Sequence, residues 1–162
     1  MSRTPEITHK IMSAVKSKDT RPEVALRTEL WRRGLRFRKN MKSLRGKPDI
    51  VFTRVKLVVF CDGDFWHGHN WAIRGYGSFE QEMERYSPQW ASKIRRNVER
   101  DKSISTELSD AGWTVLRIWE SDIKKDVKAC ADQIEYAYWN IRRNQKNNGH
   151  TTRIYLCTMV WK

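Results

Sequence analysis

The chain has 162 residues, 39% of them apolar and 31% charged, so it is long enough to form one domain around a hydrophobic core. Its 32 Lys and Arg residues against 19 Asp and Glu residues give a net charge of +13. Residues 1–48 alone hold 14 basic and 4 acidic residues, an excess of +10. This uneven charge predicts binding to a polyanion such as double-stranded DNA, with a membrane surface as the lesser alternative.

The sequence shows no signal peptide, no membrane-spanning segment and no cysteine spacing typical of disulfides or zinc sites. The sequence has no run of 18 apolar residues, and its first residues, MSRTP, lack the apolar segment of a signal peptide. We therefore expect a cytoplasmic protein, associated with the nucleoid if its source is bacterial, and no membrane partner. Cys61, Cys130 and Cys157 show no C-x-x-C spacing, which disfavours a disulfide framework and an ordinary structural zinc site.

The N-terminal half is expected to begin with a short basic helix over residues 7–15. Thr20 fits a helix N-cap, with Pro22 in the first turn and Gly34 just past the end. The apolar surface of this helix is expected to contain Val24, Leu26, Leu30 and Trp31. Short apolar runs then predict strands near residues 35–38, 47–52 and 57–60.

The C-terminal half is expected to begin with an irregular, functional loop over residues 70–87. A long helix should follow, opened by Ser87 and Pro88 and ended by Gly112. Its inward stripe, at steps of three or four residues, is Trp90, Ile94, Val98, Asp101, Ile104 and Leu108. A strand at 113–119, a final helix at 122–145 and an edge strand or core cover at 153–161 complete the pattern.

The order of these elements predicts one α/β domain over residues 1–162, with a mixed central sheet flanked by helices. No internal repeat or linker divides the chain. Residues 1–20 are interpreted as a basic N-terminal helix or arm, and residues 146–162 as a C-terminal tail.

Polar and aromatic residues follow the buried strand at 57–60, where residues 61–69 read CDGDFWHGH. Asp49 lies at the start of the preceding strand, within the sequence KPDIVF. A carboxylate such as Asp49 is a hard metal ligand, and an imidazole such as His67 can take a proton from an attacking water. The two segments together predict metal-dependent cleavage of nucleic acid, although no acid-x-lysine pair follows the Pro-Asp sequence.

Each of these residues also has a structural interpretation. Glu23 faces inward, but Thr20 and Glu23 also fit a capping box, and the two roles can coexist. Asp101 occupies an inward position of its helix, so it should meet a metal or a histidine, or else form a buried ion pair. Asp49 alone could begin a turn, and His67 alone could be a surface histidine.

Six segments, in unbroken order between residues 8 and 125, resemble the very-short-patch-repair (Vsr) endonucleases. They are SKDTRPE at 17–23, GLRFR at 34–38, LRGKPDIVF at 44–52, GDFWHGH at 63–69, KIRRNVERD at 93–101 and GWTVLRIWE at 112–120. The resemblance implies a restriction-endonuclease-like fold of the PD-(D/E)xK type that nicks one DNA strand beside a T:G mismatch using Mg²⁺.

The same resemblance implies roles for five residues. Asp49 would bind the metal directly, together with the main-chain carbonyl of Cys61, and Glu23 would reach the metal through a water molecule. His67 would be the general base, and Asp101 its acidic support. The DNA-contacting residues would include a wedge of Phe65, Trp66 and Trp90 beside the basic residues Arg45 and Lys47. Core packing is the alternative role of the three aromatic side chains.

The sequence departs from the family at its structural zinc site. The four matching positions hold Asp64, His69, Trp71 and Ser121, of which only His69 is a family ligand. These residues cannot form a closed four-ligand site, so we expect no structural zinc and local packing around Trp71 in its place. Asp62 stands where a histidine is common in the family.

Two other functions remain open from the sequence. A sequence-specific endonuclease of a restriction or homing type would keep the same Glu, Asp, His and Asp residues but read bases through residues 70–87. A noncatalytic DNA-binding module would need a disabled metal site, yet all four residues are present. Repair or guiding protein partners are not identified by the sequence.

Overall fold

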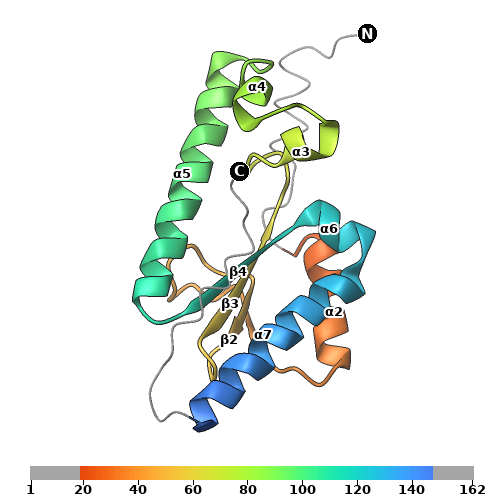
Figure 1. Cartoon of the computed structure of the whole chain (residues 1–162), viewed down its shortest axis with the longest axis vertical. Helices are drawn as coiled ribbons and strands as arrows, with labels where there is room; N and C mark the ends of the chain where they lie inside the picture. The colour runs from red at the N-terminus through yellow and green to blue at the C-terminus, as the bar shows by residue number, and fades with distance from the viewer. Residues whose placement is uncertain (1–18, 148–162) are drawn as a thin grey trace.

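The computed structural model describes residues 19–147, which form a mixed α/β structure (Figure 1). Its four strands are β1 Arg38–Lys39, β2 Ile50–Phe52, β3 Leu57–Asp62 and β4 Thr114–Trp119. They form one sheet in the order β1-β2-β3-β4. Because β1, β2 and β3 pair antiparallel whereas β3 and β4 pair in parallel, the mixed sheet that the sequence predicted is confirmed.

Six helices are described around the sheet. They are α2 Arg21–Arg32, α3 Asn70–Arg74, α4 Phe79–Met83, α5 Pro88–Asp110, α6 Glu120–Lys125 and α7 Val127–Asn147. The helix expected over 7–15 and the strand or cover expected over 153–161 lie outside the described residues. Within residues 19–147, no helix is both long and apolar enough to cross a membrane.

Helix α2 begins as the sequence predicted, because the side chain of Thr20 caps it and accepts from the Glu23 amide. Its buried face, however, differs from the prediction. Val24 and Trp31 are exposed, at 46% and 54%, and the buried face is instead completed by Glu23 and Arg27. Positions 23, 26, 27 and 30 follow the spacing of one helix face, which places 24 and 31 at the flank of that face.

The segment predicted as an irregular loop is more ordered than expected, since it contains α3 and α4. Gly75 ends α3 in the left-handed region, at φ 68°, and the Ser78 hydroxyl caps α4 by accepting from Gln81. The buried carboxylate of Glu82 connects the two ends of this segment, because it accepts hydrogen bonds from the Trp71 amide and the Tyr86 hydroxyl, each at 2.7 Å.

The single final helix predicted over 122–145 is in fact two helices, α6 and α7. Asp126 separates them, because its backbone is extended at φ −155° and ψ 90°. The Asp126 carboxylate then accepts a hydrogen bond from the Ala129 amide at 3.0 Å, as an N-cap does. A capping acid inside the predicted helix is therefore the physical reason for the break.

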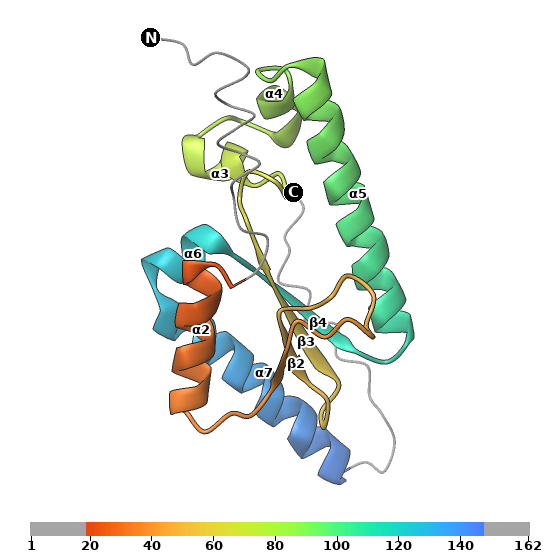
Figure 2. The same ribbon diagram turned by 180° about the vertical axis from the view of Figure 1, so that it is seen from behind.

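The two faces of the sheet are covered by different helices. Figure 2 shows α5 on one face and α2, α6 and α7 on the other. Alternate strand residues supply the two cores, because successive side chains point to opposite faces. The α5 side buries Val51, Val58, Phe60, Ile104 and Leu108. The other side buries, among others, Leu26, Leu30, Ile50, Leu57, Val59, Leu116, Ile118 and Ile134.

Candidate active site

Asp49 is fixed at the point where β2 and β3 meet. Its amide donates to the carbonyl of Val59 at 3.1 Å, and its carboxylate oxygen Oδ2 accepts from the Cys61 amide at 2.7 Å. The residue is therefore held by two groups of β3, one through its main chain and one through its side chain, and it is half-buried. The antiparallel register, with Ile50 opposite Val59, brings Asp49 next to the end of β3.

The surroundings of Asp49 are strongly negative. The pKa of Asp49 is raised to about 6, mainly by burial and also by the charges of Glu23 and Asp62, against the opposing Cys61 hydrogen bond and Arg27 charge. An oxygen-bearing site with excess negative charge fits a hard divalent cation. No group of three or more His, Cys, Asp or Glu side chains within residues 19–147 is arranged to hold a metal, so main-chain and water oxygens would complete the coordination.

Glu23 faces inward and also takes part in the capping of α2. Its Oε2 accepts from the Asp19 amide at 2.8 Å, and its Oε1 accepts from the Thr20 hydroxyl at 3.0 Å, a variant of the predicted capping box in which the bonded amide belongs to the residue before the N-cap. Glu23 is also only 3% exposed and close enough to Asp49 to raise that residue's pKa. The guanidinium of Arg27 lies 4.0 Å from Glu23 and balances part of this buried charge.

His67 lies in the turn after β3 and is oriented from two sides. Its amide donates to the Gly63 carbonyl at 3.2 Å, while Asn97 on α5 donates to the neighbouring Trp66 carbonyl at 3.1 Å. The imidazole Nδ1 is hydrogen-bonded to Oδ2 of Asp101. The inward Asp101 thus meets a histidine, one of the outcomes that the sequence predicted, and 22% of the His67 side chain remains exposed.

The electrostatics of this pair favour a charged imidazole and an ionised acid. Burial lowers the pKa of His67, but the Asp101 hydrogen bond and the charges of Asp62 and Asp101 outweigh it and raise the pKa above its usual value. Burial raises the pKa of Asp101, but the His67 hydrogen bond and the Arg117 charge hold it below its usual value. An ionised Asp101 can only accept, so Nδ1 of His67 carries the proton of the bond.

Arg117 is the residue that sequence reasoning missed. It lies on β4 with its side chain 5% exposed and forms ion pairs with both Asp62 and Asp101, at 2.6 and 3.0 Å. Its signal in the sequence was an arginine between Leu116 and Ile118 in an otherwise apolar strand. Such a residue must find acidic partners when the strand is buried on both faces.

Three aromatic side chains predicted to contact DNA form one cluster. The ring centroids of Trp66 and Trp90 lie 5.4 Å apart, and Phe65 lies 5.1 Å from Trp66 and 5.9 Å from Trp90. The ammonium of Lys93 lies 4.8 Å from the Trp66 ring. Phe65 also packs against a buried cluster that includes Met83, so its role is partly in the core, whereas Trp66 and Trp90 remain half-exposed.

The two predicted basic contacts, Arg45 and Lys47, are both exposed in the segment before β2. Arg45 forms an ion pair with Glu107 of α5 at 2.9 Å. Gly46, between them, packs closely on Ile104 and Phe60: a Cβ there would lie 2.7 Å from a methyl group of Ile104. This close approach fixes the segment beside α5 while leaving the two basic side chains accessible.

Two of the residues at the positions where the resemblance implies zinc ligands make direct contacts with α6 or its N-cap. The Asp64 carboxylate accepts from the amide and the hydroxyl of Ser121, at 3.1 and 2.7 Å. The His69 ring stacks on Trp119 at 4.1 Å between centroids, with the planes 2° apart. Hydrogen bonding and stacking therefore connect the turn after β3 to the beginning of α6.

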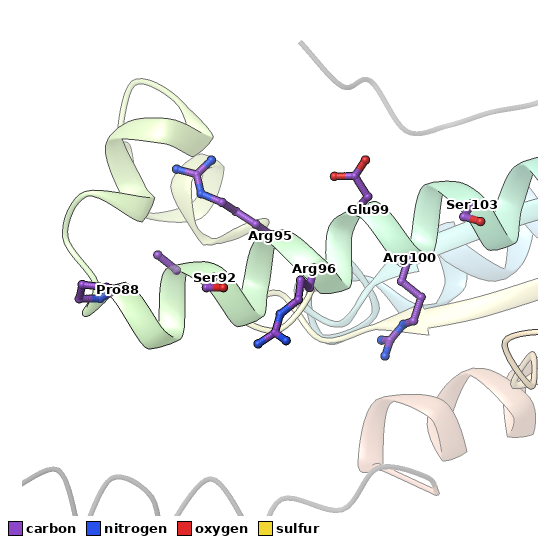
Figure 3. Close-up of a pocket in the computed structure, with 8 residues that line it drawn as sticks. Pro88, Ser92, Arg95, Arg96, Glu99, Arg100 and Ser103 are labelled. Carbon is purple, nitrogen blue, oxygen red and sulfur yellow. The ribbon is translucent and has the colours of Figure 1, made fainter.

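A groove of about 500 Å³ lies on the outer side of α5 (Figure 3). Its lining residues are Pro88, Ala91, Ser92, Arg95, Arg96, Glu99, Arg100 and Ser103. At 100° per residue, Glu99 and Ser103 lie opposite Asp101 on the helix. The groove is therefore separate from the face of α5 that carries Asp101.

The chain matches known proteins over most of its length. The family model described as DNA mismatch endonuclease Vsr matches residues 2–73, which include Glu23, Asp49 and His67. A type II nicking enzyme of Neisseria meningitidis serogroup C, V.NmeDIP, is 42% identical over 134 residues, which are 83% of this chain and 87% of the relative.

Two further relatives have similar coverage. The type II nicking enzyme V.HpaIIP of Haemophilus parainfluenzae is 40% identical over 84% of this chain and 94% of its own length. The DNA mismatch endonuclease Vsr of Escherichia coli K12 is 36% identical over 71% of this chain and 70% of its own. The protein is therefore a DNA endonuclease. It belongs to the Vsr DNA mismatch endonuclease family.

Proposed function

We propose that this protein nicks one strand of duplex DNA beside a T:G mismatch and requires Mg²⁺ to do so. The observation that carries the proposal is the His67–Asp101 hydrogen bond, which lies near the charge of Asp62, the same charge that acts on the carboxylate of Asp49. The printed names of the relatives, a mismatch endonuclease and type II nicking enzymes, support the substrate and the single-strand cut. We further propose that residues 1–162 form one domain of the restriction-endonuclease-like type.

In the proposed reaction, His67 is the general base. Its Nδ1–H donates a hydrogen bond to Asp101 and keeps its proton. The Nε2 lone pair is therefore the one that can take a proton from the attacking water. The imidazolium that forms is stabilised by the negative charges of Asp62 and Asp101. Because 22% of the His67 side chain is exposed, the ring is not closed off from water and substrate.

The metal would be held by Asp49 and the main-chain carbonyl of Cys61, with Glu23 reaching it through water. Bound Mg²⁺ supplies Lewis-acid stabilisation of the negative charge that develops on the phosphate. The hydrogen bond from the Cys61 amide keeps the Asp49 carboxylate in place, and Glu23 is kept in place by its capping contacts. The excess basic charge of the chain holds the DNA backbone through salt-sensitive contacts.

Trp66 and Trp90 would act as a wedge next to the mismatch. Inserting an aromatic side chain costs a few kcal/mol of unstacking, and this cost is lowest where base pairing is already weak. A preference for mismatched DNA follows from that difference. Phe65 would support the wedge from behind, because it contacts both tryptophans and the buried cluster.

The test is a nicking assay on a T:G duplex with either strand labelled at its 5′ end, in Mg²⁺ and in EDTA. We expect one product from one strand, next to the mismatched base, in Mg²⁺ only. Cleavage in EDTA would contradict the metal requirement. Equal cleavage of both strands would contradict the proposed single-strand nick and favour a restriction-type enzyme.

A further inference from the structure

A buried guanidinium joins the two carboxylates that face His67. The Nε and Nη2 atoms of Arg117 donate to the two oxygens of Asp62, at 2.6 and 3.0 Å, in a bidentate pair. Nη2 also lies 3.0 Å from Oδ1 of Asp101. The second Asp101 oxygen, Oδ2, is the one bonded to His67, so the Asp101 carboxylate is held at both ends.

The surroundings of Arg117 fix its position as well as its charge. Its Cζ lies 4.6 Å from the ring centroid of Phe60, the residue directly opposite on β3 in the parallel register. Nη1 donates to the Asp101 carbonyl and the Ser105 hydroxyl of α5, each at 3.4 Å. The guanidinium therefore connects the sheet to the catalytic face of α5.

The charges of this cluster do not cancel when His67 is neutral. Asp62 and Asp101 carry two negative charges, and Arg117 carries one positive charge. A purely structural ion pair needs one acid, whereas the second acid leaves a net negative charge beside the imidazole. Oδ1 of Asp62 lies 3.7 Å from Nδ1 of His67, so a proton taken up by His67 balances the cluster.

We propose that Arg117, paired with Asp62, is a positioning residue that orients Asp101 and thereby His67, and that the pair sets the proton affinity of the imidazole. This inference rests on the proposed role of His67 as the base. Arg117 opposes the imidazolium and Asp62 favours it, so the two residues act on His67 in opposite directions. The groups that face His67 are Asp62 from β3, Asp101 from α5 and Arg117 from β4.

Arg117 and Asp62 should shift the titration of His67 in opposite directions, which a purely structural ion pair would not do. Arg117→Met removes the positive charge and should move the His67 titration to higher pH. Asp62→Asn removes a negative charge and should move it to lower pH. The double variant Asp62→Asn with Arg117→Met should titrate near the native value, because both charges are removed together.

The primary measurement is an NMR titration of the His67 ring in metal-free protein, which does not depend on activity. Single-turnover nicking from about pH 5.5 to 9 and DNA binding are measured on the same proteins. We expect the acid limb of the rate profile to follow each titration. The single-turnover nicking rate should fall about 100-fold in Arg117→Met, with little change in DNA affinity.

Arg117→Lys and an arginine in another network provide the controls. Lysine keeps the charge but not the bidentate fork. The His67 titration of Arg117→Lys should therefore match that of the native protein, while its single-turnover nicking rate stays reduced. Arg33→Met removes an arginine that joins Glu29, Asp132 and Glu135 between α2 and α7, away from His67. It should lower stability while leaving the His67 titration and the nicking rate unchanged.

If Arg117→Met fails to fold with two buried acids left unpaired, Asp62→Asn, Arg117→Lys and the double variant still decide the question. A His67 titration that is the same in Asp62→Asn and the native protein would overturn the inference. Shifted titrations with an unshifted rate profile would instead show that the cluster is as described and that His67 is not the base.

Discussion

The Asp64 carboxylate, just after β3, is hydrogen-bonded to both the amide and the hydroxyl of Ser121, 57 positions away in the sequence. The two residues stand at positions where the resemblance to the family implies zinc ligands. A serine donor and a carboxylate acceptor can join directly, whereas two ligands of a metal need the ion between them. The bond therefore connects the turn that carries His67 directly to α6.

We predict that the purified protein contains no stoichiometric zinc and that a strong chelator leaves its melting temperature unchanged. A structural zinc would contribute folding free energy that the chelator would remove. Elemental analysis and thermal unfolding in EDTA are the measurements. One zinc per chain would contradict the prediction and would direct attention to Asp64, His67, His69 and a cysteine as ligands.

Ser121→Ala should lower the free energy of unfolding by about 1 kcal/mol, because it removes a partly buried hydrogen bond to a carboxylate. The matched control is Ser103→Ala, which removes a serine that donates to Glu107 on the exposed side of α5. Denaturant unfolding should show no loss in the control, since alanine also favours the helix. Equal losses in both variants would argue against the Asp64–Ser121 bridge.

Asp49→Asn should abolish nicking and, in EDTA at pH 7.5, make the protein more stable. The pKa of Asp49 is raised from 3.8 to about 6 by burial, so the folded protein binds this proton more tightly than the unfolded chain does. Native stability therefore falls as the pH rises from about 4 to 6, and asparagine avoids this cost. The gain is at most about 3 kcal/mol, from 1.36 kcal/mol per pKa unit.

The stability of both proteins is measured by denaturant unfolding across pH 4 to 8 with EDTA present. The difference between them should be absent near pH 4 and fully developed above pH 6. Glu99→Gln, on the exposed outer side of α5, is the control and should change stability by less than about 0.5 kcal/mol. An Asp49→Asn protein no more stable than the native one at pH 7.5 would contradict the raised pKa of Asp49.

His67→Ala should reduce the single-turnover nicking rate by about 10² to 10⁴-fold, which is the usual contribution of a general base. His69→Gln is the matched control, because His69 stacks on Trp119 and has no place in the proposed reaction. Its rate should stay within about tenfold of the native rate. An unchanged rate in His67→Ala from pH 6 to 9 would assign the base to another group.

Trp66→Ala should reduce the preference for mismatched over matched duplexes, because Trp66 is a half-exposed member of the aromatic cluster. The comparison variant is Trp139→Ala, which removes a tryptophan of α7 that is 45% exposed. The ratio of nicking rates on the two duplexes is measured for both. A ratio that survives Trp66→Ala would assign these rings to packing and leave residues 70–87 as the next region to examine.

Local signals were enough to predict much of the fold. Five members of the predicted stripe are buried along α5, namely Ile94, Val98, Asp101, Ile104 and Leu108, whereas its first member, Trp90, is only half-buried. Thr20 caps α2, as expected from capping chemistry. The break at Asp126 was not predicted, because an acid within a helical pattern can either face solvent or cap a new helix. The order in residues 70–87 depends on the buried Glu82, whose contacts join residues 71 and 86.

The candidate site was predicted only in part for a similar reason. Asp101 faced inward by periodicity, so a polar partner for it could be expected. Arg117 lies 55 positions from Asp62, and their pairing is set by the parallel register of β3 and β4 rather than by a local motif. Arrangements of this kind depend on tertiary packing, which the spacing of residues within one element does not contain.

The most direct measurement of the proposed function is the single-turnover nicking rate on T:G and T:A duplexes of the same sequence, in Mg²⁺, with the native protein. We predict faster nicking of the T:G duplex, in one strand only, since unstacking is less costly beside a weak pair. Equal rates on the two duplexes would contradict mismatch-directed nicking and would identify a sequence-specific endonuclease instead.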